Sequence, residues 1–209
     1  MGKPRSIAIL DYGLGNLGSV AGALEWLGCK PQITRDARLV AQADKLIIPG
    51  VGAFGDGMRK LREFGLVEVL NNFALEQKKP VLGICLGFQL MAKKSEEFGQ
   101  HNGLGWLDAE VVKLDPGPGL RLPHVGWNDL FKTRNDGLWQ DVPDDALCYY
   151  VHSYHVHCAN RDAVLAECEH GQRFTAAVGF GNIRGVQFHP EKSQRWGLQI
   201  LKNFVDGVS

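Results

Sequence analysis

The first half of the chain alternates short apolar runs with segments of helical periodicity. The apolar runs, each bounded by turn residues, predict strands over residues 7–10, 31–34, 45–49 and 81–84. Helical spacing of apolar side chains predicts helices over residues 16–27 and 86–94, and two more over residues 58–78, broken near Gly65. Strands that alternate with helices pair in parallel through crossover connections, so we expect an α/β fold. A central, mostly parallel mixed sheet flanked by helices on both faces gives three layers.

The second half of the chain is richer in strands. Strand-like patterns separated by turn residues cover residues 111–114, 147–151, 164–168, 174–178 and 183–188. Residues 197–205 have the pattern of a closing helix. We therefore expect antiparallel or mixed strands beside the parallel ones. The length of 209 residues suits one domain, and residues 1–209 are predicted to form a single domain.

The charge and cysteine content exclude several classes of protein. Lys plus Arg and Asp plus Glu both number 23, so a formal net charge of +0 provides no basic field for nucleic acid or an acidic membrane. The five cysteines include no C-x-x-C pair, which indicates a reducing compartment rather than a disulfide framework. No segment reads as a signal peptide or a membrane span, so we expect a cytoplasmic protein. The opening MGKPRS fits the permissive N-myristoylation pattern, but we interpret it as a basic lead-in to the first strand.

The sequence GICLG at residues 83–87 lies between a predicted buried strand and a predicted helix. This is the nucleophile-elbow pattern, with Cys85 where many hydrolases carry serine. The flanking glycines let neighbouring backbone pass close to a sharp turn, and a helix N-terminus stabilises a thiolate. A core cysteine packed between two glycines is the alternative interpretation.

A cysteine nucleophile needs a base, and QFHPE at residues 187–191 ends the last predicted strand. In an extended chain, residues two apart point the same way. Glu191 can therefore hold one ring nitrogen of His189 and leave the other for Cys85, which is the arrangement of a catalytic triad. A strand-end histidine with a neighbouring carboxylate is the alternative that these residues allow when taken alone.

The attacked carbonyl of a substrate becomes an oxyanion that needs hydrogen-bond donors. The main-chain N–H of Leu86 follows the nucleophile and can supply one. A second can come from the glycine-rich loop of Gly50, Val51 and Gly52, which follows the third predicted strand. The carboxyl ends of parallel strands share one edge of a sheet, so we expect the thiol, the imidazole and this loop to meet there.

Two other kinds of site are open on the residues alone. Gly13, Gly15 and Gly18 form a G-x-G-x-x-G between a strand and a helix, followed by Asp36, which is the dinucleotide-binding pattern; Asp11 beside that loop would repel a pyrophosphate. A metal site is the second alternative. Its donors would be Cys148, His152, His155, His157 and Cys158, but their spacings match no common zinc pattern, so no metal is expected.

Four motifs together resemble the class I, or triad, glutamine amidotransferases. They are PGVGAFG at residues 49–55, GICLGFQ at 83–89, SEE at 95–97 and VQFHPEKS at 186–193. Within that class, three further motifs resemble the glutaminase subunit of imidazole glycerol phosphate synthase. They are GNLGSV at residues 15–20, PHVGWN at 123–128 and YVHSY at 150–154. The resemblance covers nearly the whole chain.

The resemblance implies hydrolysis of L-glutamine to glutamate and ammonia, with no cofactor. Cys85 would attack the side-chain amide, His189 would move the proton, and Glu191 would orient His189. By motif position, the residues that would grip the amino-acid head group are Gly52, Gln89, Glu97, Ser153 and Tyr154.

The resemblance also implies a heterodimer with a (β/α)8-barrel cyclase. That partner would take the ammonia through a channel and make imidazole glycerol phosphate and aminoimidazole carboxamide ribotide in histidine biosynthesis. The positions that fall where the family meets its partner are Asn16, Trp127, Tyr149 and Lys192. Departures from the commonest subunit pattern at residues 92–94 and 105–106 leave a second hypothesis, a paralogue that feeds ammonia to another synthase, such as one amidating a surface sugar. A cysteine hydrolase that ignores glutamine is a third.

Overall fold

The computed structural model describes residues 6–207, and a mixed sheet of eight strands runs through its centre. The strands lie in the order β2 (Pro31–Thr34), β1 (Ile7–Leu10), β3 (Lys45–Gly50), β4 (Val81–Cys85), β14 (Ile183–Val186), β13 (Gln172–Phe180), β12 (Val164–His170) and β9 (Phe131–Lys132). The first five are parallel, and the last three join antiparallel to their neighbours. The carboxyl ends of β3, β4 and β14 therefore meet at one edge, where the predicted site segments begin.

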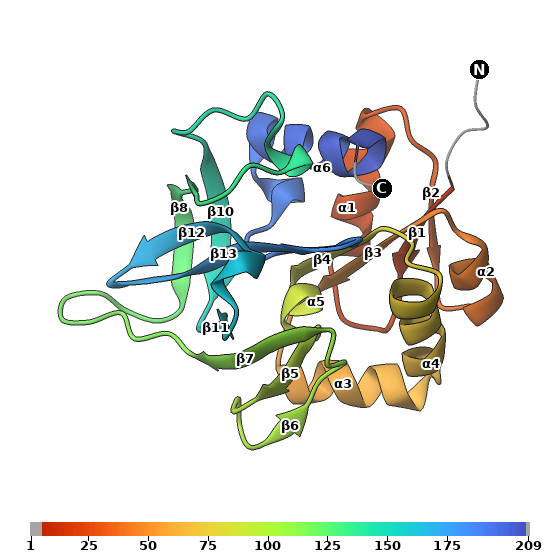
Figure 1. Cartoon of the computed structure of the whole chain (residues 1–209), viewed down its shortest axis with the longest axis horizontal. Helices are drawn as coiled ribbons and strands as arrows, with labels where there is room; N and C mark the ends of the chain where they lie inside the picture. The colour runs from red at the N-terminus through yellow and green to blue at the C-terminus, as the bar shows by residue number, and fades with distance from the viewer. Residues whose placement is uncertain (1–5, 208–209) are drawn as a thin grey trace.

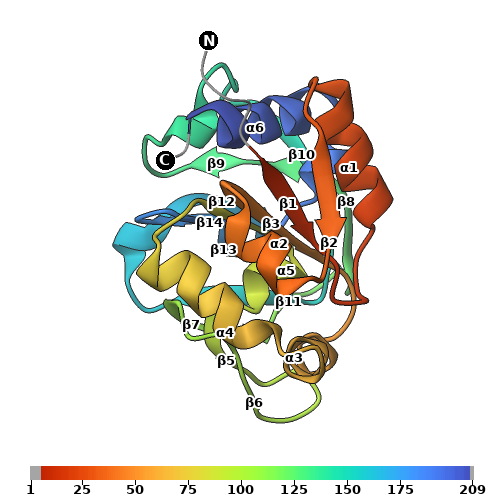
Figure 2. The same ribbon diagram turned by 90° about the vertical axis from the view of Figure 1, so that its right-hand side faces the viewer.

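Helices cover both faces of this sheet, as Figures 1 and 2 show. They are α1 (Leu17–Trp26), α2 (Ala37–Gln42), α3 (Phe54–Glu63), α4 (Leu66–Asn71), α5 (Leu86–Gln89) and α6 (Gln194–Gly207). The buried strands send alternate side chains to opposite faces. Ile7 and Ile9 of β1 pack in the core under α1 and α6, whereas Ala8 and Leu10 pack in the core under α2, α3 and α4. This confirms the predicted three layers.

Two smaller sheets extend from the central one (Figure 1). One pairs β8 (His124–Asp129) antiparallel with β10 (Leu147–His152). The other has the order β11 (Tyr154–Cys158), β7 (Leu107–Lys113), β5 (Ala92–Ser95) and β6 (His101–Asn102). Short turns of other helix types are η1 (Asn72–Glu76), η2 (Gly137–Trp139), η3 (Arg161–Ala163) and η4 (Pro190–Lys192). The expected antiparallel additions are present, and β10 and β11 deliver residues 151–154 to the site.

Most predicted elements are found where they were expected. The strand at 31–34 matches β2, and the predicted helical break occurs at Gly65, whose φ of 63° is left-handed. The helix predicted over residues 86–94 is wrong, because α5 ends at Gln89 and β5 begins at Ala92. The carbonyls of Leu90, Met91 and Ala92 accept hydrogen bonds from residues 104–107 instead of from the next helical turn. Long-range pairing therefore overrides the local helical pattern.

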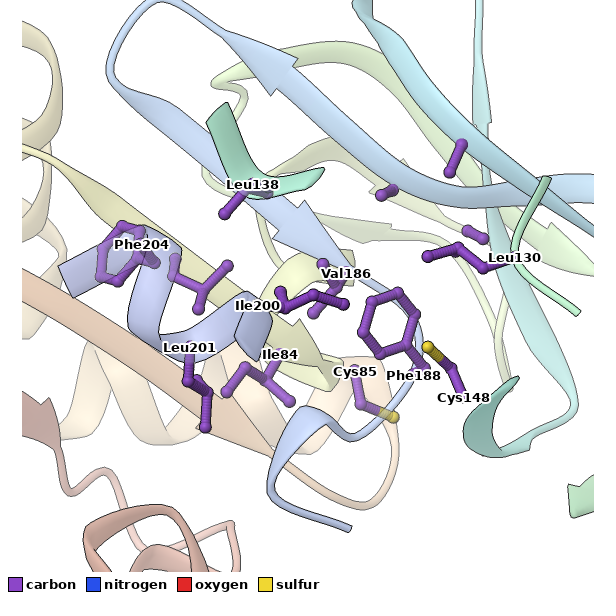
Figure 3. Close-up of a cluster of buried hydrophobic side chains, with 14 of the residues drawn as sticks. Ile84, Cys85, Leu130, Leu138, Cys148, Val186, Phe188, Ile200, Leu201 and Phe204 are labelled. Carbon is purple, nitrogen blue, oxygen red and sulfur yellow. The ribbon is translucent and has the colours of Figure 1, made fainter. Parts of the chain in front are cut away.

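A buried cluster on the α6 side of the sheet supports the edge where the site lies. Figure 3 shows Cys85 within this cluster, between Ile84 on one side and Phe188 on the other, with Ile200 and Leu201 of α6 close by. Because such cores are close-packed, the strand ends that carry the site are held rigidly.

Two observations bear on membranes. Within residues 6–207, no helix has both the length and the apolar character needed to cross a bilayer. The MGKPRS pattern falls almost wholly on residues 1–5, which lie outside the described part of the chain.

Candidate active site

Cys85 occupies the sharp turn between β4 and α5. Its φ of 52° and ψ of −109° are a strained conformation for a residue other than glycine, and such strain costs about 1–3 kcal/mol. The flanking glycines make the turn possible. A Cβ on Gly87 would lie 1.7 Å from the carbonyl oxygen of Ile48, and one on Gly83 would lie 2.7 Å from the main-chain nitrogen of Phe88. The turn therefore depends on both glycines.

His189 follows β14 and is held by Glu191. Its Nδ1 lies 2.9 Å from Glu191 Oε1, and both side chains are 2% exposed. The extended chain expected for this pair is not present, because Pro190 begins the 3-10 turn η4, which folds Glu191 back under the ring. A carboxylate accepts, so Nδ1 carries the proton and Nε2 is left for another partner. Nε2 has no well-directed hydrogen bond within residues 6–207.

The second neighbour of the His189 ring is Cys85. Burial lowers the pKa of the His189 imidazole, but hydrogen bonding to Cys85 and Glu191, together with their negative charges, raises it to about 9. The ring is therefore protonated at neutral pH when it faces the thiolate. The thiol, the imidazole and the carboxylate meet in one place, as a nucleophile, a base and an orienting group must.

The predicted oxyanion segments lie beside the thiol. Gly50 pairs with Cys85 across β3 and β4. Val51 and Gly52 follow it and, with Leu86 at the start of α5, line the same cleft as Cys85. Main-chain N–H groups from two adjacent strand ends can thus approach one point next to the sulfur.

The cleft at Cys85 has a volume of about 230 Å³. It is lined by Val51, Gly52, Cys85, Leu86, Gln89, Glu97, Val151, His152, Ser153 and Tyr154. All five residues expected to bind glutamine are among them. Drug-sized ligands occupy sites of roughly 300–1,000 Å³, so this smaller cleft suits a single amino acid.

Glu97 supplies the carboxylate of this cleft. Its Oε2 accepts the main-chain N–H of Phe54, at the start of α3, at 2.7 Å. Burial raises the pKa of the Glu97 carboxyl, and the Phe54 N–H opposes that rise. A partly desolvated carboxylate gains by pairing with a cation, so Glu97 can receive the ammonium group of an amino acid.

Three of the four predicted interface residues lie together outside the cleft. Trp127 and Tyr149 face each other across β8 and β10, with ring centroids 5.8 Å apart. The Lys192 ammonium lies 5.8 Å from the Tyr149 ring centroid. Asn16 caps α1, accepting the Ser19 N–H at 3.4 Å.

Sequence analysis missed three buried side chains that contact this machinery. Gln187 donates to Cys85 Sγ, Ser193 donates to the His189 carbonyl, and the Tyr12 hydroxyl lies against Gly50. Gln187 could have been found from the sequence. It lies two residues before His189, and residues two apart in an extended chain point the same way. Ser193 ends the VQFHPEKS motif, but the sequence does not indicate its contact with His189, and no sequence signal marks Tyr12.

The two acidic residues considered with the dinucleotide-binding pattern have other partners. Asp36 accepts from Arg38 and Leu39 as the cap of α2, and Asp11 pairs with Arg35. Within residues 6–207, no group of three or more His, Cys, Asp or Glu side chains is arranged to hold a metal ion.

Comparison with known proteins identifies the family of this chain. The model of the family "Glutamine amidotransferase class-I" matches residues 8–208. The chain belongs to that family. Solved structures agree on the fold. A crystal structure of a glutamine amidotransferase matches with a TM-score of 0.74 at 20% identity, over 95% of this chain and 98% of that one. The structure of PurLQS from Thermotoga maritima covers 99% of the chain with a TM-score of 0.74 at 18% identity, and is itself matched over 100% of its length.

Sequence relatives are more specific. Imidazole glycerol phosphate synthase subunit HisH 2 of Pseudomonas aeruginosa is 42% identical over 202 residues, which cover 97% of this chain and 100% of that protein. Subunit HisH of Sulfurimonas denitrificans is 46% identical, covering 95% of this chain and 97% of that protein. Subunit HisH of Aquifex aeolicus is 43% identical, covering 94% of each. The predicted family and subunit resemblance are confirmed.

Proposed function

We propose that this chain is the glutaminase subunit of imidazole glycerol phosphate synthase. One observation carries the proposal: Cys85, with His189 and Glu191 beside it, lies in a cleft of about 230 Å³ that also holds the half-buried carboxylate of Glu97 and two strand-end loops. The subunit assignment rests on relatives named HisH at 42% and 46% identity over nearly full length. The family match over residues 8–208 supports one domain over residues 1–209.

The reaction begins at the pair formed by Cys85 and His189. The Cys85 thiolate attacks the side-chain amide carbon of glutamine, and the carbonyl oxygen becomes an oxyanion held by the N–H groups of Val51 and Leu86. The amide C–N bond breaks as His189 gives its proton to the leaving nitrogen, which departs as ammonia. A thioester remains on the sulfur.

The second half reverses these proton movements. His189, now neutral at Nε2, takes a proton from water as that water attacks the thioester carbon. The C–S bond breaks, glutamate leaves, and the thiolate–imidazolium pair is restored. Glu191 stabilises the imidazolium whenever the ring is protonated, and it holds the ring with Nε2 toward the sulfur.

The head group of glutamine would be held at the other end of the cleft. Glu97 would pair with the ammonium group, and Gln89 still has its side-chain oxygen available, because its N–H groups bond to Tyr154 and Gln187. Gly52, Ser153 and Tyr154 would contact the remaining atoms of the head group. The length of a glutamine side chain would then set the distance between Glu97 and the sulfur.

Ammonia would pass to a (β/α)8-barrel cyclase bound as the second subunit of a heterodimer. The exposed Trp127 and the half-buried Tyr149, with Lys192 and Asn16, would meet that partner. The histidine-pathway products are then those of the synthase. The unpaired cysteines support a reducing, cytoplasmic setting.

The test is Cys85→Ala in the complex of this chain with a barrel cyclase. Glutamine-dependent synthesis should disappear, whereas synthesis from added ammonium should persist, since only the nucleophile is lost. Cys29→Ala, a half-buried cysteine away from the cleft, is the matched control and should leave both activities intact. Glutamine hydrolysis by the Cys85→Ala complex would refute the mechanism, and copurification with a sugar-modifying ligase instead of a barrel would favour the paralogue.

A further inference from the structure

The buried side chain of Gln187 contacts the sulfur of Cys85. It follows β14, is 0% exposed, and its main-chain N–H donates to the Ala176 carbonyl at 2.8 Å. Its side chain bridges two members of the cleft: Nε2 lies 3.7 Å from Cys85 Sγ, and Oε1 lies 3.1 Å from Gln89 Nε2. A buried amide with contacts on both sides has an orientation that can be derived from its neighbours.

Gln89 determines that orientation. Its Nε2 lies 2.9 Å from the Tyr154 carbonyl oxygen, which can only accept, so the amide nitrogen of Gln89 must face that way. Its second N–H then points at Gln187, which must present its oxygen. The reverse orientation of Gln187 would place two donors face to face. The N–H group of Gln187 therefore points at the Cys85 sulfur.

The Tyr154 carbonyl accepts a second side-chain donor. His152 donates to it from Nδ1 at 2.9 Å, which leaves His152 Nε2 as an acceptor. His124 must then donate from Nδ1, at 3.1 Å, and Asn128 donates to His124 Nε2, at 3.1 Å. Burial lowers the pKa of His124 to about 4 and that of His152 to about 3, in keeping with one proton on each ring. Each hydrogen bond in this series, from Asn128 to the Tyr154 carbonyl, therefore has a defined donor and acceptor.

Two titratable groups respond to Cys85. Its sulfur raises the pKa of His189, which has Glu191 behind it, and that of the buried Tyr12 hydroxyl. The His189 imidazolium is therefore a charged group beside the sulfur, and Gln187 is a neutral donor to it. A hydrogen bond donated to a charged acceptor is stronger than one donated to the neutral form, so the Gln187 amide favours thiolate over thiol.

We propose that Gln187 is a positioning residue that holds the Cys85 sulfur as a thiolate aimed into the cleft, by an N–H bond whose direction is set through Gln89 and the Tyr154 carbonyl. The inference deepens the proposed function and rests on it only where turnover is measured. Two roles have to be separated: donating to the sulfur and bracing Gln89.

Two substitutions separate these roles. Gln187→Glu keeps an oxygen toward Gln89 but replaces the donor at the sulfur with a second oxygen, whereas Gln187→Met removes both contacts. The measurement is the rate of carboxamidomethylation of Cys85 by iodoacetamide as a function of pH, followed by peptide mapping of the full-length chain. Cys29 is the internal reference, and Gln199→Met on α6 is the matched control.

If Gln187 stabilises the thiolate, the pH midpoint for Cys85 alkylation rises by about one unit or more in both variants. In the cyclase complex, kcat for glutamine falls about tenfold in both, while KM changes little in Gln187→Glu. The proposal would be overturned if the pH midpoint of Cys85 alkylation were that of the wild type in Gln187→Glu but raised in Gln187→Met. Gln187 would then only brace Gln89. Unchanged midpoints in both variants would also overturn the proposal.

Folding and function are each checked separately. Continued protection of the buried Cys148 and Cys168 from iodoacetamide reports an intact core. If a variant loses that protection, it is replaced by Gln187→Asn, whose side chain keeps the amide but is too short to reach the sulfur. Its midpoint must rise in the same way for the proposal to stand. Should the wild type fail to hydrolyse glutamine, the proposed function fails while the alkylation result still decides the role of Gln187.

Discussion

The main-chain N–H of His189 donates a hydrogen bond to the carbonyl of Tyr149 at 2.9 Å. Ser193, which is 1% exposed, completes the connection: its hydroxyl donates to the His189 carbonyl at 2.7 Å and accepts the Tyr149 N–H at 2.9 Å. The catalytic base is thus fastened to β10, whose Tyr149 ring packs against the exposed Trp127. The position of the imidazole depends on a strand that lies at the proposed partner surface.

Ser193→Ala tests this connection. The change removes both bonds and leaves the Tyr149 N–H without its acceptor, while the His189 carbonyl keeps the Lys192 N–H at 3.0 Å. We therefore expect the free energy of unfolding to fall by about 1–3 kcal/mol. We also expect kcat for glutamine to fall, because His189 loses one of its anchors. Urea denaturation and steady-state kinetics measure the two effects. Ser19→Ala on the surface of α1 is the control, and a Ser193→Ala protein as stable as that control would contradict the prediction.

Glu191→Gln tests the carboxylate behind the base. The amide keeps the shape of the side chain but removes the charge that stabilises the imidazolium, so the pKa of His189 should fall. In a serine-protease triad the equivalent change costs about 10⁴ in kcat, and we expect a loss of about 10²–10⁴ here with little change in KM. The pH dependence of kcat provides the second readout. A profile and a kcat that match the wild type would show that Glu191 does not act on the base.

Glu97→Gln and Glu97→Ala separate the charge of Glu97 from its hydrogen bond. In Glu97→Gln the side-chain amide oxygen can still accept the Phe54 N–H. In Glu97→Ala that N–H, at the start of α3, loses its acceptor. We expect KM for glutamine to rise in both variants, since the partner of the substrate ammonium is lost. Only Glu97→Ala should also lower the free energy of unfolding, by about 1 kcal/mol. An unchanged KM in Glu97→Gln would remove Glu97 from the head-group site.

The central fold could be predicted from the sequence because its signals are local. The parallel strands β1, β3 and β4 are short, fully buried runs, and the strand predicted at residues 31–34 has the bounds of β2. The three site segments follow strand ends, and the carboxyl ends of parallel strands lie at one edge. Convergence of Gly50, Cys85 and His189 therefore follows from topology alone.

What could not be predicted depends on contacts distant along the chain. The segment after α5 looks helical, but exposed Lys93 and Lys94 pair with Asp108 and Glu110 of β7, and the strand β5 forms instead. The 3-10 turn that folds Glu191 back under His189 replaces the extended chain expected there. The chain of donors from Asn128 to the Tyr154 carbonyl is likewise invisible in the sequence, since its members come from different strands.

Gly50→Ala tests how closely the oxyanion strand is packed. A Cβ at Gly50 would lie 2.1 Å from the Tyr12 hydroxyl, 2.9 Å from Leu86 Cβ and 3.0 Å from the Gly87 nitrogen. We expect the free energy of unfolding to fall by about 1–3 kcal/mol, with a loss of kcat as the loop after Gly50 shifts. Thermal or urea unfolding and glutamine kinetics measure both.

Tyr12→Phe supplies the matched partner for that experiment. The Tyr12 hydroxyl is buried and has no hydrogen-bond partner within residues 6–207, so its removal alone should not destabilise the protein. In Tyr12→Phe/Gly50→Ala the closest clash is gone, and we expect the double variant to recover part of the stability that Gly50→Ala loses. Strictly additive effects in this double-mutant cycle would mean that the two positions do not interact.

Buried neutral histidines should make stability fall in mild acid. Burial lowers the pKa of His155 to about 4, and His124 and His152 are lowered similarly, to about 4 and about 3. Below the ordinary value of about 6.5, the unfolded chain takes up protons that the folded chain does not, so the free energy of unfolding decreases as the pH falls toward 4. His189 has the opposite sign: its raised pKa contributes stability below about 6.5 that is lost as the pH rises through about 9.

His155→Asn isolates one of these protons, since His155 lies on β11 and does not line the cleft. Each histidine that takes up a proton only on unfolding contributes about 1.4 kcal/mol per pH unit to the slope. We therefore expect the free energy of unfolding of His155→Asn, measured by urea denaturation between pH 6 and 4.5, to depend on pH less steeply than that of the wild type by about this amount. Carboxylates titrate in the same window but cancel in the difference between the two proteins. Parallel slopes would mean that His155 is protonated in the folded state, against the burial that the structure gives it.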